Sequence, residues 1–107
     1  MALDSPAVAS TFQLRMYTVK PGEMADWLQE WKEKVAPLRR KFGFEIQGAW
    51  TIEESNRFVW ILSHSGPQPW ADADRAYYES PERRALDPDP ARHLAQTEHW
   101  LMQALAR

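Results

Sequence analysis

The chain has 107 residues and a formal net charge of −2, which fits one domain with a single core and disfavours nucleic acid or an anionic membrane as partner. The absence of cysteine excludes disulfides, thiolate catalysis and cysteine-ligated metals. No apolar run reaches the roughly 20 residues that span a bilayer. Residues 1–10 lack the features of a secretory signal. We therefore expect a flexible leader over 1–10, one domain over 11–107 and a cytoplasmic protein.

The first predicted element is a strand that begins near Phe12 and ends before Pro21-Gly22. Apolar and polar side chains alternate along it, with Phe12, Leu14 and Met16 against Gln13, Arg15 and Tyr17. We expect the apolar set to pack against helices. The other face places Arg15 in the middle of a sheet, where a charge is costly unless it is paired or hydrated, so we expect function there.

The remaining elements follow from periodicity and breakers. Apolar residues at steps of three and four predict a first helix, which Pro37 must kink or split. The run Arg39-Arg40-Lys41 at its end suits the helix dipole and needs no ligand. The hydrophobic pattern of the last segment, residues 91–102, fits both a helix and a strand, and the alternation of its side chains favours a strand. The predicted ranges are a helix over 23–42, strands over 45–52 and 57–65, a helix over 70–79 that restarts at Pro81 and runs to Leu86, and a strand within 91–102.

The order β-α-β-β-α-β predicts an α+β, ferredoxin-like fold, with two helices on one face of a four-stranded antiparallel sheet. Right-handed crossovers place the third strand between the first and the second. We expect Phe58, Trp60 and Leu62 of the third strand to contribute to the uncovered sheet face. The chain also has six tryptophans, more than a small monomer easily buries. A second copy, packed sheet to sheet around a cavity, is the simplest cover, so we predict a homodimer.

Several short segments, taken in order, resemble the NIPSNAP family: residues 12–22, the helix with Trp31 and Val35-Ala36-Pro37-Leu38, then Gly48-Ala49-Trp50-Thr51 and Gln96-Thr97-Glu98. The resemblance covers about residues 11–102 and implies a dimeric α/β-barrel of ferredoxin-like subunits. Its polar positions here are Arg15, Tyr17, Trp50 and Glu98. Family members often carry a histidine in the middle of the third strand, where this chain has Trp60, with His64 four residues on. Monooxygenases, haem-degrading enzymes and polyketide cyclases are related only at the level of fold.

Arg15 and Glu98 form the first candidate pair, because the first and last strands of such a sheet are neighbours. One interpretation is a structural ion pair between two buried charges. The other is a guanidinium that binds a carboxylate or enolate and is held in place by Glu98.

Tyr17 and His64 are alternative proton-transfer groups, expected at opposite ends of the sheet because their strands run antiparallel. Ordinary structural roles are the competing interpretation. The rings of Trp50, Trp60, Trp100 and Tyr78 fit core or dimer packing, or the walls of a site for a flat, apolar ligand.

No metal or cofactor motif is present: His93 and His99 lie too far apart for an obvious chelate, and phosphate loops and nucleophile elbows are absent. We expect a homodimer that binds a small apolar or aromatic metabolite, with no cofactor. If it is an enzyme, Tyr17 or His64 moves a proton of an enolisable substrate, Arg15 stabilises the oxyanion, and Trp50, Trp60, Glu98 and Trp100 contact the substrate. A non-catalytic binding or scaffold dimer is the alternative, and a haem-binding oxygenase is a third reading.

Overall fold

The computed structural model describes residues 11–105, so the predicted leader lies outside the described residues. Its elements are β1 (Thr11–Val19), α1 (Met24–Glu30), the π-helical turn η1 (Trp31–Val35), α2 (Ala36–Lys41), β2 (Phe44–Ile52), the 3-10 turn η2 (Glu53–Ser55), β3 (Arg57–His64), α3 (Trp70–Glu79), α4 (Pro81–Arg84), the 3-10 turn η3 (Pro90–His93) and β4 (Leu94–Met102).

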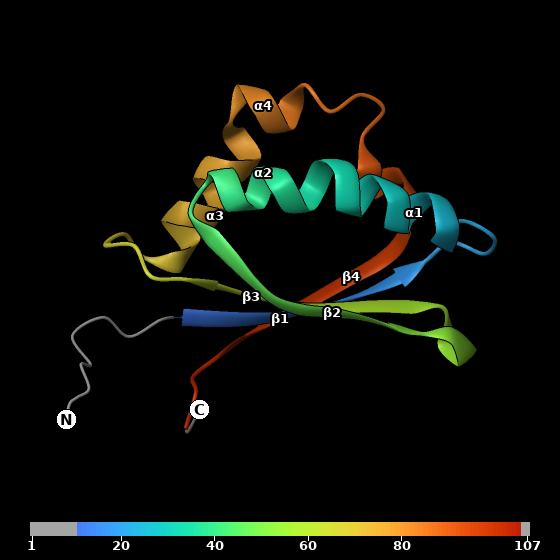
Figure 1. Cartoon of the computed structure of the whole chain (residues 1–107), viewed down its shortest axis with the longest axis horizontal. Helices are drawn as coiled ribbons and strands as arrows, with labels where there is room; N and C mark the ends of the chain where they lie inside the picture. Colours follow the sequence, from blue (N-terminus) through green and yellow to red (C-terminus); the bar gives the residue numbers. More distant parts are fainter. Residues whose placement is uncertain (1–10, 106–107) are drawn as a thin grey trace.

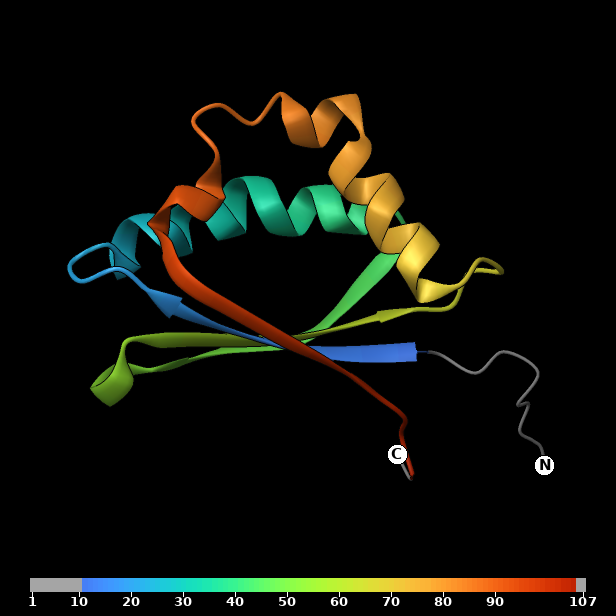
Figure 2. The same ribbon diagram turned by 180° about the vertical axis from the view of Figure 1, so that it is seen from behind.

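The four strands form one antiparallel sheet in the order β2-β3-β1-β4. The helices all lie on one side of this sheet, and β4 crosses behind β1 in Figure 1 and in front of it in the reverse view of Figure 2. The predicted α+β ferredoxin-like architecture is therefore confirmed, including the place of β3 between β2 and β1. The final segment is a strand as predicted, but it begins at Leu94 because Pro90–His93 forms a 3-10 turn.

The first helix is continuous from Met24 to Lys41, with a π-turn in place of the predicted kink. The N–H of Ala36 donates to the carbonyl of Trp31, five residues back, in the turn just before Pro37. Proline has no N–H and crowds the preceding turn, and a widened turn accommodates both effects.

The side chains of β1 point the opposite way from our prediction. Gln13, Arg15 and Tyr17 are buried under the helices, whereas Phe12, Leu14 and Met16 are half-buried on the uncovered face. Arg15 pairs with Trp60 of β3, and Tyr17 pairs with Phe58, so these aromatic rings share the helix-facing side. The prediction that they line the uncovered face is wrong. The buried charge is tolerated because Gln13 and Tyr17 of β1 and Tyr78 of α3 supply polar partners, described below.

The core between the layers is built largely from aromatic rings. Trp31 of the π-turn meets Phe58 and Trp60 of β3 with ring centroids 5.1 Å and 5.4 Å apart. The four-residue spacing of Trp27, Trp31 and Val35 keeps all three on this buried face. Edge-to-face contacts of this kind stabilise the packing beyond the area that they bury.

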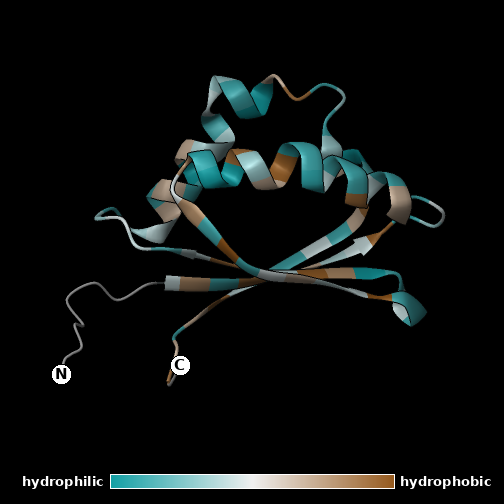
Figure 3. Ribbon diagram, in the orientation of Figure 1, coloured by the Kyte–Doolittle hydropathy of each residue, from teal (hydrophilic) through white to brown (hydrophobic). Residues whose placement is uncertain are grey.

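The uncovered face of the sheet remains markedly apolar. Trp50 of β2 is 52% exposed and Trp100 of β4 is 48% exposed. Hydrophobic segments recur along the strands, while the β2–β3 connection is hydrophilic (Figure 3). None of the helices in the described part of the chain has the length and apolar character needed to cross a membrane.

Candidate functional site

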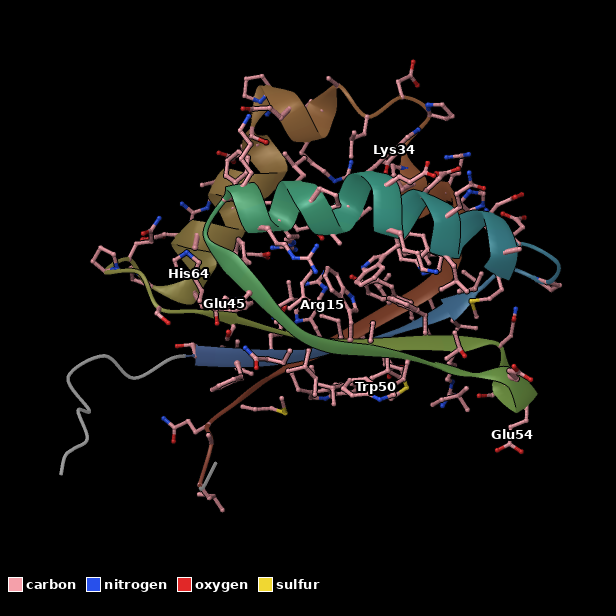
Figure 4. All side chains as sticks on the ribbon, in the orientation of Figure 1. Arg15, Lys34, Glu45, Trp50, Glu54 and His64 are labelled. Atoms are coloured by element: carbon pink, nitrogen blue, oxygen red, sulfur yellow. The ribbon has the colours of Figure 1, made fainter. Side chains whose placement is uncertain are left out.

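A cavity of about 210 Å³ lies between the sheet and the helix layer. Arg15, Tyr17 and Trp60 line it from the sheet, and Arg39, Tyr78 and Arg83 line it from the helices. Residues of η3 and the start of β4 complete the wall. In Figure 4, Arg15 points from the sheet toward the helices, into this layer.

Arg15 is 6% exposed, and all of its described hydrogen-bond partners are neutral. Its Nε donates to the hydroxyl of Tyr17 (2.6 Å), its Nη1 to Oε1 of Gln13 (2.6 Å) and its Nη2 to the hydroxyl of Tyr78 (3.0 Å). Burial opposes its positive charge, but the tyrosine oxygens and the more distant Asp74 outweigh that effect and raise the pKa of Arg15. The guanidinium is thus a permanent buried cation that is hydrogen-bonded to no carboxylate of residues 11–105.

Arg39 of α2 is the second cation of the cavity and is 1% exposed. Its Nη1 donates to Oδ1 of Asp74 (2.8 Å), and its Nη2 donates to the same Tyr78 hydroxyl as Arg15 (3.4 Å). The guanidinium carbon lies 3.9 Å from the ring centroid of Tyr77 and 4.6 Å from that of Phe44, which are cation–π contacts. Arg39 is therefore held rigidly with one donor directed at Tyr78.

Tyr17 is suited to donate a proton and not to remove one. Burial raises the pKa of its hydroxyl above the usual value of 10.0, despite the nearby Arg15. The phenol is therefore neutral at pH 7. Because its oxygen already accepts from Arg15, its O–H is free to donate to a ligand.

The cavity is lined by hydrogen-bond donors and lacks a conventional base. Among its described lining residues there is no aspartate, glutamate or histidine. Five lining residues carry a buried polar atom without a hydrogen-bond partner among the described residues: the indole N–H of Trp27 and of Trp60, the Nε–H of Arg39 and of Arg83, and the hydroxyl of Tyr77. A donor-rich, positively charged and largely aromatic cavity suits a ligand with an apolar body and an anionic oxygen.

Three predicted site residues, Arg15, Tyr17 and Trp60, meet at this cavity. His64 does not reach it. It lies at the far end of β3, paired with Thr11, while Tyr17 pairs with Phe58, so the predicted separation of Tyr17 and His64 is confirmed. The Nδ1 of His64 accepts from the N–H of Gly66 (3.1 Å), and its ring packs on Phe44.

The other three, Trp50, Glu98 and Trp100, lie on the uncovered face of the sheet. Across the β1–β4 ladder, Arg15 pairs with His99, and Glu98 pairs with Met16. The predicted contact between Arg15 and Glu98 is wrong, because Glu98 lies one residue away from the position opposite Arg15. In a strand, a shift of one residue places the side chain on the opposite face of the sheet. Figure 4 shows Trp50 on the opposite side of the sheet from Arg15.

Arg39 is the functional residue that sequence reasoning missed. We assigned it with its basic neighbours to the helix dipole, but it alone of the three is buried. A signal was available, since Arg39 lies four residues after Val35 and eight after Trp31, in phase with the buried positions. Tyr78 was singled out only as an aromatic ring, and its hydroxyl proves to be the meeting point of two arginines.

A separate polar cluster closes one end of the cavity wall. The Nδ1 of buried His93 lies 2.8 Å from a carboxylate oxygen of Glu23, and its Nε2 lies 3.1 Å from one of Glu30. Arg92 also donates to both oxygens of Glu30. Within residues 11–105, no group of three or more His, Asp or Glu side chains is arranged to hold a metal ion.

Comparison with known proteins decides the family. Residues 12–105 match the sequence profile of NIPSNAP. The chain belongs to the NIPSNAP family. No curated protein matches the sequence.

Solved structures share the fold of this NIPSNAP chain. A NIPSNAP domain protein from Burkholderia xenovorans has a TM-score of 0.77 at 16% identity, over 90% of this chain and 95% of the other. A NIPSNAP protein from Agrobacterium tumefaciens has a TM-score of 0.80 at 12% identity, over 95% and 91%. A provisionally named antibiotic biosynthesis monooxygenase from Nitrosomonas europaea has a TM-score of 0.68 at 11% identity, over 98% and 96%. At such identities the likeness establishes the fold alone.

Proposed function

We propose that this NIPSNAP protein binds a small, largely apolar or aromatic metabolite in the cavity between the sheet and the helices, and stabilises negative charge on one of its oxygens. The observation that carries the proposal is Arg15, a buried cation whose hydrogen-bond partners among the described residues are all neutral. A buried charge without an opposite charge in contact is costly, and such a cost is typical of a functional site.

The lining chemistry limits the reaction that the site supports. Tyr17 is a neutral proton donor, Arg15 is a fixed cation, and the described lining offers no carboxylate or imidazole base. The site therefore suits protonation or stabilisation of an enolate or phenolate that is already ionised, and not abstraction of a proton by the protein. The name of the Nitrosomonas europaea protein indicates a monooxygenase of antibiotic biosynthesis, and the same limit would apply to an oxygenation in this cavity.

We also propose that the functional unit is a homodimer joined through the uncovered sheet face. Leu14 at the centre of this face has Ile61 and Trp100 as its cross-strand neighbours, and all three are apolar. Trp50 and Trp100 expose about half of their surface in the single chain. Such a self-complementary apolar face is typical of an isologous subunit interface.

The experiment uses 4-nitrophenol, whose phenolate absorbs visible light. Added to the protein at a pH near the pKa of the free probe, it should bind and show an increased phenolate fraction, because the site stabilises the anion. Thr97 lines the cavity from β4, so Thr97→Trp should abolish the effect, while Ala95→Trp on the same strand, outside the lining, should preserve it. No binding, or binding with an unchanged phenolate fraction, would contradict the proposal and favour a scaffold dimer.

A further inference from the structure

We infer that the ligand is a monoanionic carboxylic acid with a body about the size of one ring, and that its carboxylate is held jointly by Arg15 and Arg39 in place of the Tyr78 hydroxyl. This inference rests on the proposed function and specifies its ligand class.

The geometry of the two arginines points to a two-oxygen acceptor. Arg15 reaches from the sheet and Arg39 from α2, and each directs an Nη2 at the single oxygen of Tyr78, at 3.0 Å and 3.4 Å. One neutral hydroxyl oxygen is a weak acceptor for two cations. A carboxylate has two oxygens and about four lone-pair sites, and it forms shorter, charge-assisted bonds with guanidinium groups.

Charge balance favours an anion at this point. Of the two buried cations, only Arg39 contacts a carboxylate, that of Asp74. The third arginine of the lining, Arg83, already pairs with Asp89 (2.9 Å). The cluster of Arg15, Arg39 and Asp74 thus carries one uncompensated positive charge, which a single carboxylate neutralises.

The size and walls of the cavity limit the body of the ligand. A cavity of about 150 Å³ lined by apolar side chains accommodates benzene. The cavity here is about 210 Å³, which leaves room for a ring with a short acidic substituent. Trp27, Trp60 and Tyr77 in its lining supply aromatic surface for that ring.

Tyr78 is placed to give way to the ligand. It is 40% exposed and lies one residue from the end of α3, whereas its neighbour Tyr77 is buried in the core. Rotation of this side chain away from the cluster frees both Nη2 donors. Its ring also lies 5.2 Å from the guanidinium carbon of Arg39 and 5.6 Å from that of Arg83, so the bound carboxylate must offset these cation–π contacts as well. Arg39 keeps its place meanwhile through Asp74, Phe44 and Tyr77.

The test compares benzoate with benzamide, a neutral molecule of the same shape, by calorimetric or NMR titration of the full chain at pH 7. Replacing neutral with charge-assisted hydrogen bonds should make benzoate bind on the order of 10- to 100-fold more tightly. Arg39→Met should remove that preference. Arg40→Met, an exposed neighbour on the same helix, should retain it. Tyr78→Phe keeps the ring, removes the competing acceptor and should strengthen benzoate binding.

The outcomes separate the two proposals. Equal binding of benzoate and benzamide would overturn the carboxylate site, and so would a preference for benzoate that survives Arg39→Met. If the protein still stabilises 4-nitrophenolate in that case, the proposed oxyanion-stabilising function remains. If Arg39→Met does not fold, weaker benzoate binding by Tyr78→Phe would overturn the inference by itself. Failure of benzoate, benzamide and 4-nitrophenol to bind would overturn both.

Discussion

Arg15 and Arg39 belong to opposite layers of the fold, yet both donate to one oxygen, the hydroxyl of Tyr78. Two like charges brought together in a buried place oppose folding, and one carboxylate offsets them only in part. This arrangement predicts that the site is maintained at a cost in stability.

The first prediction concerns the variant Arg15→Met, which keeps much of the side-chain volume and removes the charge. We expect the free energy of unfolding to change by less than about 2 kcal/mol, because removal of a buried charge offsets the loss of the hydrogen bonds that Arg15 donates to Gln13, Tyr17 and Tyr78. Stabilisation of 4-nitrophenolate should be lost. Urea unfolding and the absorbance assay measure the two effects. A loss of about 2 kcal/mol or more would mean that Arg15 is chiefly a structural residue.

The second prediction concerns the uncovered sheet face. Leu14→Glu puts a charge between Ile61 and Trp100, so we expect it to convert a dimer into a monomer. Native mass spectrometry and sedimentation of the full chain measure this change. Leu101→Glu, one residue along β4 from Trp100 and 59% exposed, should leave the dimer intact. A wild-type monomer at micromolar concentration would rule out the interface.

The third prediction separates the two tryptophans that the sequence suggested as ligand contacts. Trp60 is buried among aromatic rings, so Trp60→Ala should cost about 3–5 kcal/mol of unfolding free energy. Trp50→Ala should change it by about 0.5 kcal/mol or less, because its side chain is half exposed. Both variants are best measured in the Leu14→Glu background, where subunit association does not contribute. Similar costs for the two would contradict the assignment of Trp60 to the core.

The fourth prediction is a pH dependence that arises at His93. Burial opposes its charge, but hydrogen bonds to Glu23 and Glu30 outweigh burial and raise the pKa of the imidazole above 6.5, although the charge of Arg92 acts in the opposite direction. The resulting stabilisation is complete below the unfolded-state pKa and is lost as the pH rises through the folded-state value. Arg92 and His93 also lower the pKa of Glu30, so the contribution of that carboxylate is lost only under acid conditions.

We therefore expect the urea midpoint of the wild type to fall as the pH rises above the unfolded-state pKa of about 6.5. His93→Gln should flatten this part of the profile. A slope that persists in His93→Gln would assign it to another group.

Periodicity was sufficient to predict the elements and their order in the sheet, because hydrophobic spacing and Pro-Gly breakers act locally. It was insufficient to orient β1. Alternation separates Arg15 and Tyr17 from Leu14 and Met16, but it does not say which set the helices cover. We assumed that the more apolar set faces the helices. The polar set faces the helices instead, because Gln13 and Tyr78 accept hydrogen bonds from Arg15 on that side. Tyr78 is distant in sequence, so the alternation of β1 does not indicate it.

Two site predictions failed for reasons of register and context. Glu98 was placed beside Arg15 from the adjacency of their strands, but the ladder is offset by one residue. Arg39 was assigned with Arg40 and Lys41 to the helix dipole, because the three charges stand together at a helix end. Its helical phase with Trp31 and Val35 indicates burial, but its partners Asp74 and Tyr78 are distant in sequence and no local pattern reveals them.

The π-turn at Trp31–Val35 also sets the phase of the residues that follow it. Each residue of a regular helix advances about 100° around the axis, so a helix shortened by one residue before Pro37 would turn everything after it by that angle. The side chain facing the sheet at the level of Tyr78 would then no longer be Arg39. The length of the π-turn therefore decides whether Arg39 faces the cavity, although the side chains of the π-turn are not themselves hydrogen-bonded to Tyr78. In this chain, deletion of one residue from that segment would therefore change the charge at the proposed ligand site without any substitution of Arg15, Arg39 or Tyr78.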